Sequence, residues 1–288
     1  MRRAAAGGSV LLALLALPAA LAAQDSLRLA FVPLQGVTMH RVFQTHTLLT
    51  LSGVDSTGQP TEQRREVADL GGMRQVSLPG PDRAQTVHLT YDSLRFRGRA
   101  AAGPWREVAV PDPESRWIQA RMDSHMRLLE ITGGGEHPSA GLLVHLLTGV
   151  PGLVLPAGWV EAGDRWNAQL EFPLADVVGG EPTGLMPRFL HVRAAFTVDS
   201  VRTRANDTLA YLAFTGTYPP QRVSAADGRR AEFGGVLRGT LVWSTGWRSV
   251  VSAATRSRVQ FGVVQRGATD PAGRVTLETT IRQSVVPE

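Results

Sequence analysis

The sequence predicts a mainly β protein built from curved antiparallel sheets, and three observations support this. Apolar and polar residues alternate in several separate runs, such as 86–91 and 165–172, which is the spacing of a strand with one buried and one solvated face. Turn-forming residues separate these runs at short intervals. Only one segment has the composition of a buried helix. We therefore expect a half-barrel or two related β halves, with one short apolar helix near 138–148.

Residues 1–22 have the features of a signal peptide. Arg2 and Arg3 precede the apolar run 10–17, and the sequence Ala-Leu-Ala that ends at Ala22 has the small side chains that signal peptidase accepts. The apolar run is too short to cross a membrane, which takes about 20 apolar residues, and no later run is long enough. We expect cleavage near Ala22, a periplasmic or secreted protein, and no transmembrane segment in the mature chain.

The first half, 23–135, consists of predicted strands. Val87, Leu89 and Tyr91 alternate with polar residues. The segment 117–128 is rich in helix-forming residues, yet its apolar side chains share one parity, as they do in a strand. We therefore predict a hairpin that turns near residues 123–125.

The connecting segment 136–150 contains the predicted helix. Pro138 suits a first helical turn, and Gly149 followed by Pro151 suits a helix end. The helix would be apolar on nearly every side, so it should be buried, either as a plug within a curved sheet or as a lid over an apolar cavity. Its ligand-binding candidates in the second case are Leu142, Leu143 and Leu146.

The second half, 151–288, shows the same strand pattern. Apolar residues alternate with polar ones in 165–172, from Leu190 to Val198 and from Val275 to Ile281. The hairpin segment 122–127 also resembles 243–248, since both place an apolar residue, a short polar turn, a second apolar residue and an arginine in that order. This similarity suggests an internal duplication.

The start of the second half resembles a known family. Residues 155–166 contain the pattern LPxxxVxxGDxW, in which Gly163 and Asp164 form a turn and Trp166 is the first inward residue of a strand. This pattern is similar to that of an uncharacterised family of exported bacterial β-rich proteins, in which a Gly-Asp-x-Trp turn opens the second half. The resemblance covers about 27–285 and implies an organisation without an activity. More remotely, the expected fold is similar to the half-barrels of periplasmic lipoprotein carriers.

The composition excludes several mechanisms. The chain has no cysteine, and all thirty basic residues are arginine. Disulfides, lipid attachment to cysteine and thiolate chemistry are therefore absent, as are Schiff-base and P-loop chemistry, which need a lysine. No Gly-x-Ser-x-Gly pentapeptide is present for a serine nucleophile. After loss of the signal peptide the net charge falls to about +3, too small to indicate a nucleic-acid partner.

The histidines and carboxylates do not form a recognisable site. His40 and His46 share a strand face but lie about 20 Å apart, too far to bind one metal ion. Glu161, Asp164 and Glu171 cluster near tryptophans, as in a glycosidase, but Glu171 lies on the face opposite the inward residues. We predict no catalytic residue, no metal ligand and no cofactor.

Three hypotheses about function follow. The first is an exported, non-catalytic cell-envelope protein that binds an apolar ligand, such as a lipid or acyl chain, or an envelope partner; Trp166 joins the helix leucines as a candidate contact. The second is a structural scaffold or accessory subunit without a ligand pocket. The third is a hydrolase whose catalytic residues are distant in sequence.

Overall fold

A computed structural model describes residues 26–54, 57–101, 103–108, 117–133, 149–150, 152–173, 189–204, 206–224, 228–269, 271 and 273–286. Within these residues the one helical element is the 3-10 turn η1 (Pro81–Arg83). The predicted helix at 138–148, with Leu142, Leu143 and Leu146, lies outside the described residues.

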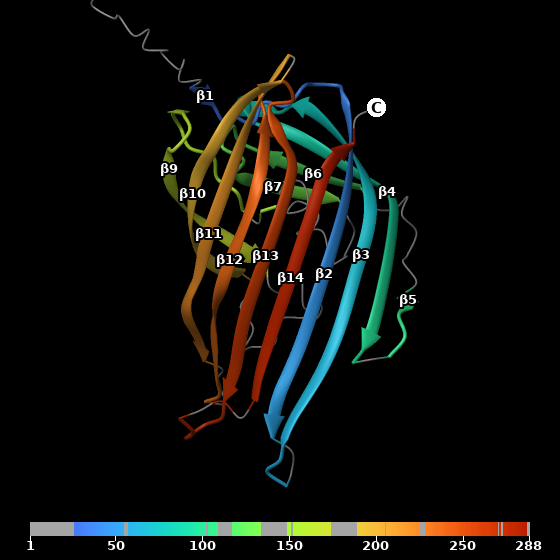
Figure 1. Cartoon of the computed structure of the whole chain (residues 1–288), viewed down its shortest axis with the longest axis vertical. Coiled ribbons are helices and arrows are strands. Elements are labelled where there is room, and N and C mark those ends of the chain that lie inside the picture. The colour runs from blue at the N-terminus through green and yellow to red at the C-terminus, as the bar shows by residue number, and fades with distance from the viewer. Residues whose placement is uncertain are drawn as a thin grey trace, which may run out of the picture.

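The described part of the chain contains fourteen strands (Figure 1). In the first half they are β1 (Leu27–Arg28), β2 (Thr38–Val54), β3 (Pro60–Pro79), β4 (Gln85–Ala100), β5 (Arg106–Val108), β6 (Trp117–Met122) and β7 (Leu128–Gly133). In the second half they are β8 (Trp159–Val160), β9 (Arg165–Pro173), β10 (Phe189–Arg204), β11 (Asp207–Ser224), β12 (Arg230–Ser244), β13 (Ser249–Val264) and β14 (Gly273–Val286).

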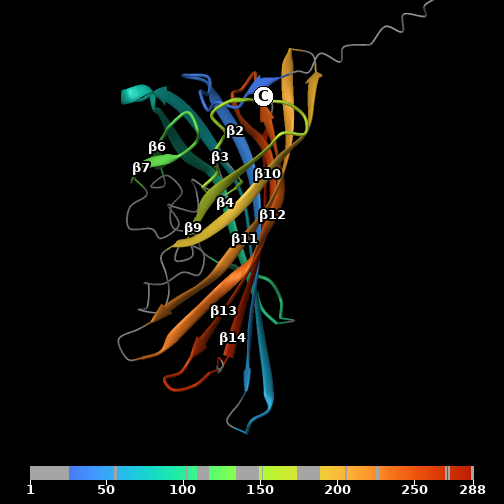
Figure 2. The same cartoon turned by 90° about the vertical axis from the view of Figure 1, so that its left-hand side faces the viewer.

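Twelve of these strands form one open antiparallel sheet. Its order is β7-β6-β4-β3-β2-β14-β13-β12-β11-β10-β9, with β5 paired to β4. The edge strands β7 and β9 lie at opposite ends of this order, and the long central strands twist strongly along their length (Figure 2). The prediction of a mainly β, antiparallel fold is therefore confirmed.

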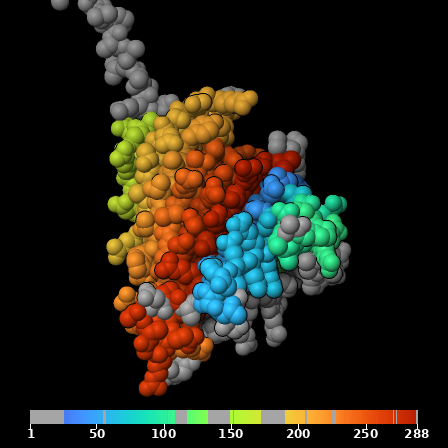
Figure 3. All heavy atoms as spheres, turned by 60° about the horizontal axis from the view of Figure 1, so that its bottom comes forward, coloured from blue at the N-terminus to red at the C-terminus, as the bar shows by residue number. Residues whose placement is uncertain are grey.

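The strands of the two sequence halves occupy the two ends of the strand order, not its two faces. Strands β2 to β7 form one part of the sheet and β9 to β14 form the other. The two parts meet where β2 pairs with β14 (Figure 3). The first and last long strands thus form the middle of the sheet. The half boundaries at 23–135 and 151–288 stay a prediction.

The hairpin expected near residues 123–125 is present. β6 and β7 pair on either side of it, and the Asp123 carboxylate accepts hydrogen bonds from the backbone N–H groups of His125 (2.8 Å) and Arg127 (2.9 Å). The corresponding turn after β12 differs in its backbone, because the left-handed residue is Met126 in the first hairpin and Arg248 in the second. The aligned segments therefore share a hairpin but not one turn geometry.

The inner face of the large sheet is the face that carries its buried residues, such as Phe43, Met73 and Phe196. A second, small sheet closes one end of this inner face. β1 pairs with β8, and the segments beside these strands pack against the large sheet. The Phe31 N–H donates to the Ser124 carbonyl (2.8 Å), and the Leu155 N–H donates to the His125 carbonyl (2.9 Å). Phe31 is fully buried by this packing. Irregular backbone thus fills this end of the interior, held by hydrogen bonds to the β6–β7 hairpin.

Candidate functional site

The Gly-Asp-x-Trp turn positions the one candidate residue that the structure describes. Gly163 adopts a positive φ of 95°, and the Asp164 carboxylate accepts a hydrogen bond from the Glu161 N–H at 2.9 Å. This turn leads into β9 with Trp166 on the inner face. The turn and inward ring predicted from the sequence are confirmed.

Trp166 is the first of three aromatic rings that cross the inner face. Its ring stacks on Phe196 of β10, with the ring centroids 5.0 Å apart and the planes 9° from parallel. Phe196 in turn lies 5.4 Å from Phe214 of β11. The Trp166 Nε1–H donates to the Val154 carbonyl at 3.2 Å, which holds the partly buried ring in place. We call Trp166, Phe196 and Phe214 the aromatic row.

The same cross-strand row becomes polar beyond the aromatic rings. Strand register continues it through Gly239, Thr255, Ile281 and Thr45 to Asp69 of β3. The Thr255 hydroxyl donates to the carbonyl of Gly149, and the Thr45 hydroxyl donates to Asp69 Oδ2 at 2.5 Å. One row of the inner face therefore runs from an apolar end to a buried carboxylate.

Asp69 is incompletely satisfied in this position. Its side chain is buried, and its Oδ1 atom has no hydrogen-bond partner within the described part of the chain. Burial raises the pKa of the Asp69 carboxyl above its ordinary value, because the charged form loses its hydration, while the Thr45 hydrogen bond acts in the opposite direction. A donor or a proton at Oδ1 would therefore stabilise this group.

Arg41 is a buried cation on the same face. It is 1% exposed and donates to three neutral groups: Gln75 Oε1 (2.7 Å), Gln283 Oε1 (3.2 Å) and Ser249 Oγ (3.2 Å). No ion pair to Arg41 is present among the described residues. Desolvation lowers the pKa of Arg41 to about 9. The guanidinium is thus held by hydrogen bonds to three other strands.

Sequence reasoning missed both buried charges. Arg41 shares the inward parity of Met39 and Phe43, and Asp69 shares that of Met73. The sequence did contain one signal for these buried charges, namely a charged residue at a position where the alternating pattern expects an inward, apolar side chain. It indicates a buried polar group, but it does not show which side chains surround that group.

The other polar candidates lie on the outer face. His40 contacts Asp92 at 3.5 Å and His46 contacts Glu66 at 3.2 Å, so the prediction that both are strand-face residues is confirmed. Glu171 lies 3.7 Å from His191, away from the aromatic row. Among the described residues no group of three or more His, Cys, Asp or Glu side chains is arranged to hold a metal ion.

No family model matches the chain, and no curated protein matches it. Among solved structures, one that concerns lipid–protein interactions in lipovitellin matches 88% of this chain at 9% identity and a TM-score of 0.52. The chain spans 25% of the length of that lipovitellin chain. The likeness shows a similar fold. The resemblance based on the Gly-Asp-x-Trp turn stays a prediction.

Two further structures overlap this chain more weakly. A putative exported protein from Bacteroides fragilis with a YmcC-like fold matches 81% of this chain and 93% of its own length at 10% identity, with a TM-score of 0.17. Pseudomonas aeruginosa OpdQ matches 87% and 98% at 8% identity, with a TM-score of 0.20. These scores are too low to indicate a shared fold. In the described residues no helix has the length and hydrophobicity to span a membrane.

Proposed function

We propose that the protein is a non-catalytic envelope protein that binds an amphiphile, a lipid or acyl chain with a polar head, on the inner face of its open sheet. The observation that carries this proposal is the single row that joins the aromatic rings of Trp166, Phe196 and Phe214 to the buried Asp69 carboxylate. The signal-like segment 1–22 supports the export step and a periplasmic or secreted location.

The two ends of the row suit the two parts of such a ligand. Aromatic and aliphatic side chains offer apolar surface, and removing about 100 Å² of apolar area from water gains about 2.5 kcal/mol. A hydroxyl or ammonium group on the ligand would supply the donor that Asp69 Oδ1 lacks. Phe196, Phe214 and Asp69 are buried, so the interior must open around an entering ligand.

The comparison with lipovitellin supports the same proposal. That structure concerns lipid–protein interactions, and its fold is similar over most of this chain. Fold alone does not determine function, so the likeness adds to the inner-face argument and does not replace it.

A second candidate function rests on the sheet edge. Within the described residues β7 pairs only with β6, and Leu128 (42% exposed) and Leu129 (51% exposed) lie on this edge. An unpaired apolar edge strand can accept a strand from another protein. This arrangement supports the alternative of an accessory subunit that docks an envelope partner.

Titration of the full chain with a fluorescent fatty acid tests amphiphile binding. We expect saturable binding that Trp166→Ala weakens about tenfold, since the variant removes one ring of the aromatic row. Trp159→Ala is the matched control, because Trp159 is 69% exposed on β8 and lies outside the row, and its affinity should stay within about twofold of wild type. Absence of binding, or equal losses in both variants, would contradict the proposal.

A further inference from the structure

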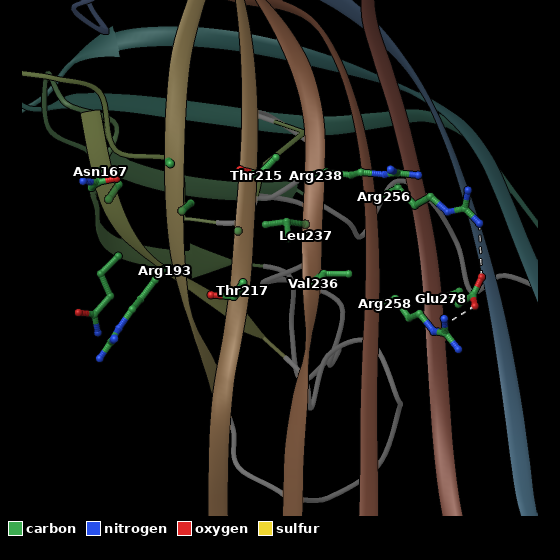
Figure 4. A pocket seen from close by; sticks show the side chains of 15 residues that line it. Asn167, Arg193, Thr215, Thr217, Val236, Leu237, Arg238, Arg256, Arg258 and Glu278 are labelled. Carbon is green, nitrogen blue, oxygen red and sulfur yellow. Dashed lines mark ion pairs between the residues drawn. The ribbon is translucent and has the colours of Figure 1, made fainter. Parts of the chain in front are cut away.

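A cavity of about 1080 Å³ opens on the outer face of the sheet, opposite the aromatic row (Figure 4). It lies over two neighbouring cross-strand rows that run from β10 to β13. The first row consists of Arg193, Thr217, Val236 and Arg258. The second row consists of Ala195, Thr215, Arg238 and Arg256. We call the hollow above these eight residues the arginine trough.

Side-chain size gives the trough its shape. Ala195, Thr215 and Thr217 are short and form its floor, while longer side chains stand on both sides of them. Figure 4 shows Arg193 on one side of the two threonines and Arg238, with the β13 arginines, on the other. Neighbouring strands are about 4.8 Å apart, so the Cα atoms of β10 and β13 face each other across about 14 Å. The trough is therefore wide enough for an extended molecule that touches both walls.

Positive charge is in excess in the trough. The lining contains four guanidinium groups and one carboxylate, Glu278, which contacts Arg256 Nη2 at 3.5 Å and Arg258 Nε at 3.4 Å. The side chains of Arg193 and Arg238 have no ion pair or hydrogen bond to any other residue that the structure describes. The two walls thus each carry an uncompensated cation.

Several charges elsewhere on the outer face are paired. Asp92 contacts Arg74 at 2.6 Å, and Glu66 contacts Arg99 at 2.8 Å. Arg222 likewise contacts Glu232 at 3.0 Å. A concave region with unpaired cations attracts anions more strongly than such a balanced surface. The trough therefore differs from these paired positions, because it combines a hollow with two unpaired guanidinium groups.

We propose that the arginine trough binds an acidic oligosaccharide, a sugar chain that carries carboxylate, sulfate or phosphate groups. Guanidinium groups pair with such anions in a two-pronged geometry. The threonine hydroxyls of the floor and the amides of Asn167 and Gln169, which also line the trough, can hydrogen-bond to sugar hydroxyls. Arg193 and Arg238 hold acidic groups on opposite walls.

The lining disfavours other polyanions. It contains no aromatic side chain among the described residues, so it offers no stacking platform for nucleobases. Its backbone groups are paired within the sheet, so an acidic peptide cannot join it as an added strand. The site lies on the face opposite the amphiphile site, so loss of one activity does not require loss of the other.

Calorimetric titration of the full chain at physiological ionic strength tests the proposal. The two titrants are short dextran sulfate and neutral dextran of equal length. We expect binding of the sulfated chain alone. The double variant Arg193→Gln/Arg238→Gln should lose at least about tenfold in affinity. The matched control Arg74→Gln/Arg222→Gln removes the same charge from paired positions and should stay within about twofold.

A third variant separates a shaped site from a charged surface. Ala195→Tyr fills the floor without changing charge, and we expect a similar tenfold loss. The proposal is overturned if dextran sulfate does not bind, if the control double variant loses as much affinity, or if Ala195→Tyr binds normally. It is also overturned if phosphatidylglycerol vesicles or single-stranded DNA bind more tightly with the same dependence on Arg193 and Arg238.

Discussion

Arg41 and Asp69 place charge inside a face that is otherwise largely apolar. Neither group is compensated by an opposite charge among the described residues; Arg41 relies on neutral partners, and Asp69 has one partner and one orphaned oxygen. Buried groups of this kind cost folding free energy. In the proposed function, a donor on the ligand head offsets the part of this cost that comes from Asp69 Oδ1.

The pKa of Asp69 makes its contribution to stability depend on pH. A carboxyl whose pKa is raised by folding binds its proton more tightly in the folded state, so stability falls as pH rises through the folded-state pKa. The side chain in Asp69→Asn keeps an oxygen that can accept the hydrogen bond from the Thr45 hydroxyl, and it is neutral at every pH. We expect its free energy of unfolding to exceed that of wild type by about 1–3 kcal/mol at pH 7. The difference should shrink as pH falls below the ordinary carboxyl pKa.

Urea denaturation of both proteins across the acidic and neutral pH range measures this difference. Asp92→Asn is the control, since Asp92 is partly exposed and ion-paired with Arg74, and this variant should not be more stable than wild type at neutral pH. A less stable Asp69→Asn protein at neutral pH would show that the ionised carboxylate is required by the fold.

Removal of Arg41 should destabilise the protein. Arg41→Ala removes the donor from which Gln75, Gln283 and Ser249 each accept a hydrogen bond and creates a cavity, so we expect a loss of about 2–4 kcal/mol in the free energy of unfolding. Arg222→Ala, at an exposed and ion-paired position, should change it by less than about 0.5 kcal/mol. Thermal unfolding followed by circular dichroism compares the two, and equal stabilities would refute a structural role for Arg41.

At the level of strands, close packing between neighbours depends on glycine. A Cβ atom at Gly239 of β12 would lie 2.7 Å from the Phe214 ring and would overlap the Ala254 carbonyl oxygen. We expect Gly239→Ala to cost about 1–3 kcal/mol because the aromatic row must shift. Gly234→Ala on the same strand meets no atom closer than 3.9 Å and should be neutral or stabilising. Chemical denaturation tests this pair, and equal effects would contradict it.

Several strands were predictable because their information is local. The parity of 117–128 outweighed its helix-forming composition, and the alternation at 165–172 placed Trp166 on the inner face. Other features have no local signal. Gln283 and Arg41 are 242 residues apart and meet only because β14 pairs with β2 in one particular register. Periodicity shows which face a residue occupies, but it does not show which strand lies beside it.

At the level of the whole molecule, the fold class was predictable and the strand order was not. The alternating runs and turn signals predict antiparallel strands, but they are equally compatible with two separate halves and with one shared sheet. The pairing of β2 with β14 decides between these arrangements, since it joins both halves into one open sheet. The arginine trough depends on the same order, because its two rows cross four neighbouring strands, from β10 to β13.

Native mass spectrometry of the full chain, exported into a bacterial periplasm and purified without detergent, tests amphiphile binding most directly. We predict a species heavier than the polypeptide by the mass of a lipid, which organic extraction converts to the bare mass. Trp166→Ala should reduce this species, and Trp159→Ala should not. Only the bare polypeptide mass, before and after incubation with excess fatty acid or lysophospholipid, would contradict the proposed function.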